Sequence, residues 1–312
     1  MTKCPILPGI VLASLIFSIG LNNVACASQS TFSALSFNIW GLPEPLLKKA
    51  ERIPFLTRAM EEAPASVIAF QETFSDEMAP LAKLKAYPYV VYGPSGSFPR
   101  ISSGLLIASR YPIVKTNRRI FTVCAGTDCF SRKGMLHARV QTPEGALIDV
   151  FNTHLTSDGP NETRARQAAE FVAFILEYAS KDRAYILMGD YNSRPDSPAI
   201  RHLLAALPLT DTYSQFVSNH PEFDSVAQNG FSFDRVRNPN ATSQGRIDYV
   251  FASPEFTTVG SSLVYDSKYQ GHFLSDHFGV LTHFDFTVTP AMYQNDNRPE
   301  ERDNPWDSAQ EI

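Results

Sequence analysis

Short apolar runs, many with a period of two or rich in β-branched residues, recur along this chain and constrain its fold more than any other feature. They are Phe32–Ile39, Ser66–Gln71, Tyr89–Tyr92, Gly104–Ser109, Leu147–Thr153, Ala184–Gly189, Ile247–Ala252 and Phe278–Val288. Such runs are typical of strands that are buried in a sheet. The sequence therefore predicts a domain built on several short β-strands.

Helical periodicity is clearest between Thr163 and Ala179. Five apolar residues of this segment fall on one face of a helix: Ala168, Phe171, Val172, Ile175 and Leu176. A weaker helix is expected from Pro45 to Glu61. Because strands and helices do not alternate strictly, we expect an α+β fold, a layered sandwich with two central, mainly antiparallel β-sheets flanked by helices. The domain should span residues 28–289, followed by a polar tail over residues 290–312.

The first 27 residues have the layout of a secretory signal peptide. Lys3 precedes an apolar stretch over residues 10–20, and Ala25-Cys26-Ala27 offers a small-x-small cleavage site. We therefore expect cleavage near Ala27 and a secreted or periplasmic protein. The alternatives are a buried N-terminal helix and a lipoprotein in which Cys26 carries the lipid.

Cysteine usage agrees with export. Without the leader only Cys124 and Cys129 remain, and Gly126 between them permits a tight turn. In an oxidising compartment such a pair forms a small disulfide loop. Two cysteines alone make a poor zinc site, because structural zinc takes four ligands. The sequence therefore favours a disulfide bond between the two.

The charge of the chain argues against nucleic acid as a partner. The formal net charge is −5 at pH 7. Proteins that bind a polyphosphate backbone usually show a basic stripe, and the sequence shows none. A nuclease is therefore disfavoured, although a local basic patch within an acidic total would still allow one.

Polar residues stand at or beside the ends of several predicted strands. The candidates are Asn38, Glu72, His154, Asp190, Asn192, Asp248, Asp276 and His277. Asp190 and Asn192 are two positions apart, so their side chains point to one face. Strand ends that bring polar side chains to one rim are how many sheet-based enzymes build a site. Each motif is weak alone, and their combination in one chain carries the prediction.

Acidic residues in this set suit metal-assisted cleavage of a phosphodiester. Glu72 is a suitable oxygen ligand for Mg²⁺, which keeps several waters and needs few protein carboxylates. Asp190 would lie near the leaving oxygen or the attacking water. Asp276 would either bind a second ion or orient a neighbour, which leaves one and two metal ions as open alternatives.

The remaining residues suit proton transfer and charge stabilisation. His277 would take the proton from the attacking water, and Asp248 would fix its tautomer by a hydrogen bond to the other ring nitrogen. Asn38, Asn192 and His154 would donate hydrogen bonds to the phosphoryl group.

The order and wording of these segments resemble the endonuclease/exonuclease/phosphatase superfamily, the deoxyribonuclease I-like metal phosphoesterases. The resemblance covers nearly the whole domain, from about Phe32 to Phe286. It implies a four-layered α/β sandwich with one Mg²⁺-dependent site at the rim of two central sheets, where Mn²⁺ or Co²⁺ can substitute. By motif, the implied catalytic residues are His277, His154, Asp190, Asn192, Asp248 and Asp276, and the implied metal residues are Glu72, the principal ligand, and Asn38.

Within this superfamily the chain looks most similar to the neutral sphingomyelinases, the sphingomyelinase C branch. The similar segments are residues 38–43, 70–72, 103–107, 111–113, 133–134 and 137–140. The resemblance implies a monomer that contacts a membrane surface and splits the lipid sphingomyelin into ceramide and phosphocholine. One segment departs from the haemolytic members: residues 267–273 form a short stretch with only two aromatic residues, Tyr269 and Phe273, which would either touch a bilayer or pack against the protein.

Three rival functions remain beside a sphingomyelin phosphodiesterase. They are an exported nuclease of the same fold, an enzyme for another phospholipid or phosphoinositide, and a binding module on a decayed scaffold. The last is least favoured, because a decayed site would have lost some of its polar residues.

Overall fold

The computed structural model describes residues 28–43, 50–179, 183–220, 222, 230–239, 241 and 243–293. The predicted signal peptide lies outside these residues, as does most of the predicted tail. The described helices are α1 (Ile53–Glu61), α2 (Asn161–Tyr178), α3 (Pro198–Ala206) and α4 (Thr212–Asn219), with short 3₁₀ turns η1 (Ala50–Arg52), η2 (Asp76–Lys83), η3 (Gly126–Phe130) and η5 (Pro290–Tyr293). None of the helices in the described part of the chain is long and apolar enough to cross a bilayer.

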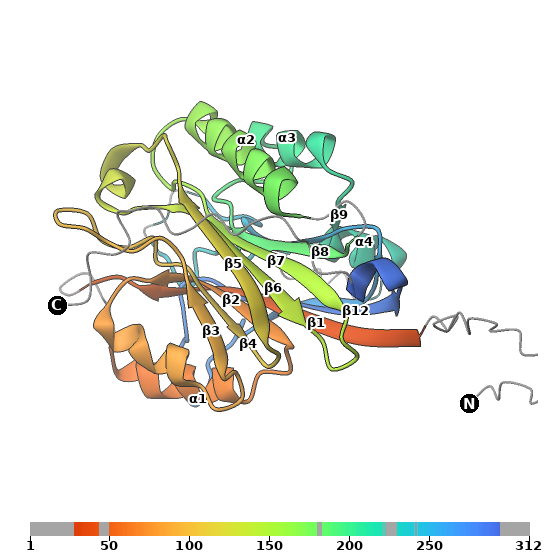
Figure 1. Ribbon diagram of the computed structural model, residues 1–312. Coiled ribbons are helices and arrows are strands. Elements are labelled where there is room, and N and C mark those ends of the chain that lie inside the picture. Colours follow the sequence, from red (N-terminus) through yellow and green to blue (C-terminus); the bar gives the residue numbers. More distant parts are fainter. Residues whose placement is uncertain are drawn as a thin grey trace, which may run out of the picture.

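Two six-stranded sheets form the centre of the molecule (Figure 1). The first has the spatial order β11 (Phe256–Val264), β12 (Gly279–Val288), β1 (Ser28–Gly41), β2 (Val67–Thr73), β4 (Leu106–Ser109) and β3 (Tyr89–Tyr92). The second has the order β5 (Ile113–Ile120), β6 (Gly134–Gln141), β7 (Leu147–His154), β8 (Tyr185–Asp190), β10 (Asp248–Ala252) and β9 (Thr210–Asp211). β1–β2 and β7–β8 are the parallel pairs, and the other pairs are antiparallel.

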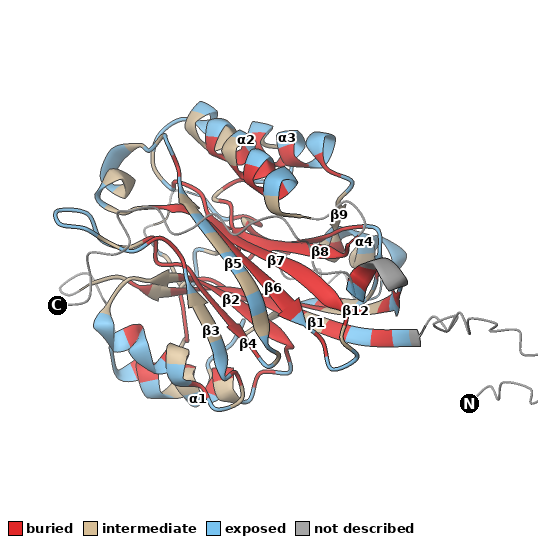
Figure 2. Ribbon diagram, in the orientation of Figure 1, coloured by how far each residue is buried: buried red, intermediate tan, exposed pale blue. Residues whose placement is uncertain are grey.

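The molecule has four layers, as predicted. α1 and η2 cover the outer face of the first sheet, and α2 and α3 cover the outer face of the second (Figure 1). A buried apolar cluster fills the space between the two sheets. Most central strands are therefore buried along their whole length, whereas the helices expose one side (Figure 2). Burial on both faces explains why strands such as β4 and β8 read as nearly continuous apolar runs.

All eight predicted strands are present, each within a few residues of its expected bounds. The sequence patterns missed the long strands β5, β6 and β11. β6 is buried along nearly its whole length yet contains His137 and Arg139, which hide its apolar pattern. In β5, exposed and half-buried residues alternate, because this strand lies at the edge of its sheet.

Three details differ from the helix and tail predictions. Of the weaker helix expected from Pro45 to Glu61, the described part is η1 followed by α1 from Ile53, and residues 45–49 lie outside the described residues. Leu176 points to solvent and is 62 % exposed, while Phe174 is buried instead, so the buried face of α2 is turned from the predicted one. The predicted tail also begins too early, because η5 continues the domain and the side chain of Met292 is buried in the core between the sheets. In addition, α3 was missed although Ser197 before Pro198 is a helix-start signal; its hydroxyl accepts a hydrogen bond from Ile200 N.

Candidate active site

The topology brings the predicted strand ends to one edge of the two sheets. β1 and β2 are parallel neighbours, so Asn38 and Glu72 near their C-terminal ends lie together. β7 and β8 are the parallel pair of the second sheet, with His154 directly opposite Asp190. β10 runs antiparallel to β8, so its first residue, Asp248, also pairs with Asp190. The site therefore spans both sheets at their common edge.

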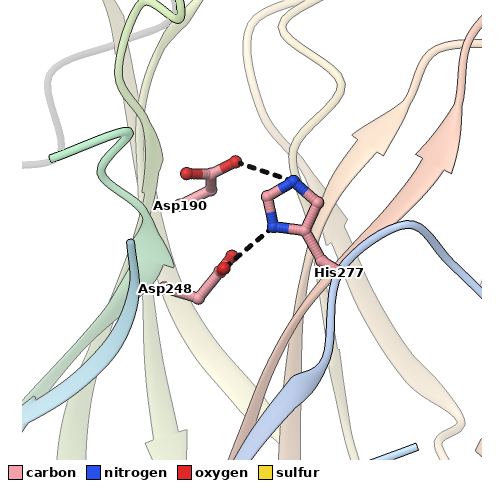
Figure 3. Close-up of side chains that lie close together, drawn as sticks. All are labelled: Asp190, Asp248 and His277. Atoms are coloured by element: carbon pink, nitrogen blue, oxygen red, sulfur yellow. Dashed lines mark hydrogen bonds and ion pairs between the residues drawn. The ribbon is translucent and has the colours of Figure 1, made fainter. Parts of the chain in front are cut away.

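His277 forms a dyad with Asp248 at this edge (Figure 3). Its Nδ1 lies 2.8 Å from Oδ2 of Asp248, and its Nε2 points to Oδ2 of Asp190 at 3.8 Å. Burial disfavours the charged ring, but the negative charges of Asp248 and Asp190 outweigh it and hold the pKa of His277 well above its usual value. Ser275 links the backbone of His277 to β1, since its hydroxyl accepts from His277 N at 3.1 Å and donates to Asn38 O at 2.6 Å.

The Asn38 side chain links the carboxylates of the two sheets. Its Nδ2 donates to Oε1 of Glu72 at 3.0 Å and to Oδ2 of Asp190 at 2.9 Å. Its Oδ1 accepts from Trp40 N at 3.0 Å, at a point where the β1–β2 register shifts. Beneath it, Gln71 Nε2 donates to Asn152 Oδ1 at 2.8 Å, and both side chains are fully buried. These contacts fix the position of one sheet relative to the other directly below the site.

Glu72 is held in an arrangement that favours a cation. Its backbone φ is +61°, a region that non-glycine residues rarely adopt, and such strain gathers at functional sites. Burial raises the pKa of its carboxyl group. Its Oε2 is buried and has no hydrogen-bond partner among the residues that the structure describes. A buried carboxylate oxygen without a donor is costly unless a cation or water reaches it.

The acids of the site outnumber its permanent cations. Arg52 is buried beside it and donates through Nη2 to Trp40 O at 2.6 Å, rather than to a carboxylate. Asp276, next to the dyad, has a pKa raised to about 6 by burial and by the nearby Glu72. This excess of buried negative charge fits a hard divalent cation. Glu72, Asp276 and Asn38 would hold it.

A purely geometric grouping points to a different set of ligands. The ligand atoms of Asp190, Asp248 and His277 all lie within 4.8 Å of one another. Oδ2 of Asp248 and Nδ1 of His277 already form a 2.8 Å hydrogen bond with each other. Among the described residues, Oε2 of Glu72 and Oδ1 of Asp248 both lack a hydrogen-bond partner, so both sides of the site offer a carboxylate oxygen to a cation.

Lys133 and Asp128, which were not among the predicted site residues, complete the other side of the site. Lys133 Nζ lies 3.1 Å from Nε2 of His154 and forms a 2.9 Å ion pair with Asp128. Asn192 Nδ2 lies 3.0 Å from the same Nε2. Facing two donors, Nε2 of His154 acts as an acceptor, and burial together with Lys133 lowers the pKa of His154 to about 3. The expectation that His154 donates to the phosphoryl group stays a prediction, and the contacts of its Nε2 with two donors count against it.

The structure also bears on the predictions for the two cysteines, for His137 and for the aromatic residues of the 267–273 segment. Cys124 and Cys129 form a disulfide bond. His137 is buried far from the strand ends and contacts Asp149, which agrees with a structural role. Tyr269 donates to Glu62 at 2.9 Å, and the guanidinium of Arg237 stacks over the ring of Phe273 at 4.5 Å. The two rings of the 267–273 segment therefore pack against the protein.

Comparison with known proteins agrees with this geometry. A sphingomyelinase of Mycobacterium tuberculosis is 29 % identical over 194 residues, which is 59 % of this chain and 39 % of the relative. An inositol phosphosphingolipids phospholipase C of Schizosaccharomyces pombe is 24 % identical over 307 residues, 83 % of this chain and 70 % of the relative. The chain thus spans about two fifths of the mycobacterial relatives that it matches.

Solved structures share the fold. A variant of the Staphylococcus aureus beta toxin with bound magnesium ions superposes with a TM-score of 0.61 at 20 % identity, over 81 % of this chain and 99 % of the toxin. The family model described as "Endonuclease/Exonuclease/phosphatase family" matches residues 35–277, a range that begins in β1 and ends at His277 of the dyad. With more than half of its residues matched, and with two sheets whose polar strand ends meet at one edge, this chain belongs to the endonuclease/exonuclease/phosphatase family.

Proposed function

We propose that this protein is a secreted, Mg²⁺-dependent phosphodiesterase that hydrolyses sphingomyelin to ceramide and phosphocholine. The observation that carries the proposal is the pairing of two elements at one edge of the sheets. One is Glu72, with a buried carboxylate oxygen that lacks a partner in the described structure. The other is the His277–Asp248 dyad. Asn38 and Asp190 lie between them.

The acidic side of the site supplies the metal ligands in this proposal. Glu72 is the principal ligand. Asn38, which donates to Oε1 of Glu72, and Asp276, whose pKa is raised by the charge of Glu72, lie close enough to assist it. When bound, the divalent cation would neutralise the phosphoryl oxygens and lower the pKa of His277 by adding positive charge. The beta toxin has the same fold and holds bound magnesium ions, which supports the choice of Mg²⁺.

His277 acts as the general base. The 2.8 Å contact with Asp248 keeps the proton on Nδ1, so that Nε2 is free to take a proton from the attacking water. Nε2 faces the centre of the site, because it points toward Asp190 Oδ2 at 3.8 Å. Asp248 orients the imidazole and stabilises the imidazolium that forms, as a buried carboxylate does for other histidine bases.

The opposite side of the site stabilises the charge that develops on the phosphoryl oxygens. Lys133 carries a buried ammonium group, and Asn192 presents a side-chain amide beside it. Both are held by Nε2 of His154, which places them as a pair before substrate arrives. The side chain of Asn192 is held by Nε2 of His154 and by Leu155 O, each 3.0 Å from its Nδ2, and its backbone φ is +46°.

The choice of a lipid substrate rests on the relatives. The mycobacterial protein is named a sphingomyelinase, and the yeast protein is a phospholipase C for inositol phosphosphingolipids. Both names describe sphingolipid phosphodiesters, so the same bond is proposed here, with phosphocholine as the first choice of headgroup. The disulfide between Cys124 and Cys129 supports export, because such bonds persist in oxidising compartments.

A headgroup-release assay tests the proposal. The purified mature chain is given sphingomyelin, phosphatidylcholine, inositol phosphosphingolipid or plasmid DNA, each in Mg²⁺ and in EDTA, with lipids in detergent micelles. We expect phosphocholine from sphingomyelin in Mg²⁺ only. Preferential release from the inositol lipid would move the substrate within the same class. Nicking of plasmid without lipid hydrolysis would replace the proposal with a nuclease, and no hydrolysis of any substrate would refute it.

A further inference from the structure

Two loops at the active-site edge carry aromatic side chains that the fold does not use. Phe98 lies in the loop between β3 and β4 and is 99 % exposed, and Phe130 in η3 is 67 % exposed. Ile101, whose backbone N donates to Phe130 O, is also exposed. Large apolar side chains that gather on a surface in this way mark an interaction site more often than a chance exposure. We call Phe98, Ile101 and Phe130 the aromatic tip.

The two loops form one unit. Ile101 N donates to Phe130 O at 2.9 Å, and Arg132 N donates to Ile101 O at 3.1 Å. Within the first loop, Ser97 and Arg100 pair as a tight hairpin that presents Phe98 at its turn. The disulfide of Cys129 closes the second loop next to Phe130. The exposed rings are therefore held out by backbone hydrogen bonds and a covalent bond.

The base of this unit is part of the active-site rim. At the end of the first loop, Gly104 O accepts from Thr73 N at 2.9 Å, directly beside Glu72. The second loop leads into Lys133, whose Nζ contacts His154 at 3.1 Å. In Figure 1 the β3–β4 loop projects beyond the sheet edge at which β1 ends, and Figure 2 shows its tip as exposed. A surface that receives the tip would therefore face the mouth of the site.

The charge of the tip indicates what kind of surface this is. Residues 93–103 contain no acidic residue and one basic residue, the exposed Arg100. In the second loop the charge of Asp128 is met by Lys133, which leaves Arg132 as its remaining charge. Aromatic rings flanked by arginine side chains suit the interface of a phospholipid bilayer, where the rings enter the acyl boundary and the cations meet phosphate groups. The acidic chain as a whole lacks this character.

We propose that the aromatic tip is a membrane-docking element, which inserts into a phospholipid surface and holds the active-site mouth against it. The inference rests on the proposed lipid substrate, but it assigns membrane contact to loops other than the 267–273 segment. There, Tyr269 and Phe273 are already engaged with Glu62 and Arg237.

Vesicle binding tests the tip without turnover. The full chain is sedimented in EDTA with vesicles of phosphatidylcholine and a minor fraction of phosphatidylglycerol. We expect the double variant Phe98→Ser, Phe130→Ser to lower the partition coefficient by about tenfold or more, because two rings no longer bury apolar area. Leu176→Ser is the matched control, since Leu176 is 62 % exposed but lies on α2 in a different layer; it should bind like the wild type.

A second variant gives a direct readout of insertion. Phe98→Trp should show a blue-shifted emission and quenching by brominated lipid beyond the signal of the unsubstituted protein. Wild-type protein that does not bind vesicles, a double variant that binds them equally well, or an unquenched Trp in the Phe98→Trp variant would each overturn the proposal. Equal binding by the double variant would assign the tip to another kind of partner.

Activity separates this inference from the proposed function. The double variant should hydrolyse a monomeric short-chain sphingomyelin like the wild type and long-chain sphingomyelin in vesicles about tenfold more slowly. If the wild type hydrolyses neither form, yet its vesicle binding depends on Phe98 and Phe130, the sphingomyelinase proposal fails and the docking element stands.

Discussion

Two groups of buried or half-buried charged side chains are built in opposite ways: one lies within the second sheet, and the other lies at the edge that both sheets share. The first, which we call the β6–β7 cluster, consists of His137, Arg139 and Asp149. The Asp149 carboxylate lies 2.8 Å from Arg139 Nε and 2.8 Å from His137 Nε2. Burial alone would raise the pKa of Asp149, but these partners lower it to about 2. Its one negative charge is met within the protein.

The second group, the site cluster, is Glu72, Asp190, Asp248, Asp276 and His277. Here the acids exceed the bases, burial raises the pKa of Glu72, and the pKa of Asp276 is raised to about 6. Oxygen atoms of Glu72 and Asp248 remain without partners in the described structure. Burial of charge does not by itself mark a functional site. In the β6–β7 cluster the single acid is met by arginine side chains, Arg139 at 2.8 Å and Arg183 at 4.0 Å, whereas the excess of acids in the site cluster suits a further cation.

The largest expected effect is on activity, from the site cluster. Replacing His277 with Ala should lower kcat for sphingomyelin by about 10²–10⁴-fold, the usual contribution of a general base. Initial rates in micelles measure this. His283→Ala is the matched control, because His283 lies on β12 outside the site, and it should keep full activity. A His277→Ala protein with wild-type kcat would remove the dyad from the mechanism.

The next effect is on stability, from the β6–β7 cluster. Asp149→Asn should lower the free energy of unfolding by about 3–5 kcal/mol, because it leaves the buried Arg139 without its counter-charge. The folded fraction should keep its kcat. Urea denaturation measures the change, with Glu144→Gln, an exposed acid between β6 and β7, as the control. Loss of kcat with unchanged stability would show that the two clusters do not differ as argued.

Metal should stabilise the site cluster alone. Mg²⁺ at a hundredfold excess over its Kd should add about 3 kcal/mol to the free energy of unfolding and raise the Tm by several degrees. Glu72→Gln should abolish this shift, while Asp149→Asn should retain it from a lower starting Tm. Thermal unfolding with and without EDTA measures both. An equal Mg²⁺ shift in the Glu72→Gln variant would place the cation elsewhere.

The smallest effect is an opposite pH dependence of the two clusters. The pKa of Asp149 is about 2 when folded, so its contribution to stability is present above its unfolded value near 4 and is lost as pH falls toward 2. Asp276 has a raised pKa of about 6, so without metal its contribution is lost as pH rises from about 4 to 6. Each change amounts to roughly 2–3 kcal/mol at most.

The Asp276→Asn variant separates the pH dependence due to Asp276 from that due to Asp149. In EDTA, the variant should lose less stability than the wild type between about pH 4 and pH 6, where the raised pKa of Glu72 still contributes, and it should keep the loss at more acidic pH. Urea denaturation across this pH range measures both slopes. If the variant and the wild type show parallel pH profiles from pH 4 to pH 6, the buried charge of Asp276 is not a cost to the folded protein.

Much of the fold was readable because burial imposes a local pattern. β8 is apolar over consecutive positions, and apolar residues recur at short intervals in β1, so the sequence located both strands. β6 escaped because the β6–β7 cluster places His137 and Arg139 inside a buried strand, where local pattern predicts a surface. Which side of α2 would be buried also depended on its neighbours, as the exposure of Leu176 shows.

The sequence by itself determined which residues stand at strand ends and what chemistry their side chains can perform, because strand periodicity and side-chain chemistry are local properties. Only the tertiary structure decided their partners. Lys133 lies in the site and is paired with Asp128. Nε2 of His154 faces two donors, Lys133 and Asn192, and therefore accepts. Such contacts join positions far apart in the chain, and the pairing of the two sheets, which no local pattern encodes, brings them together.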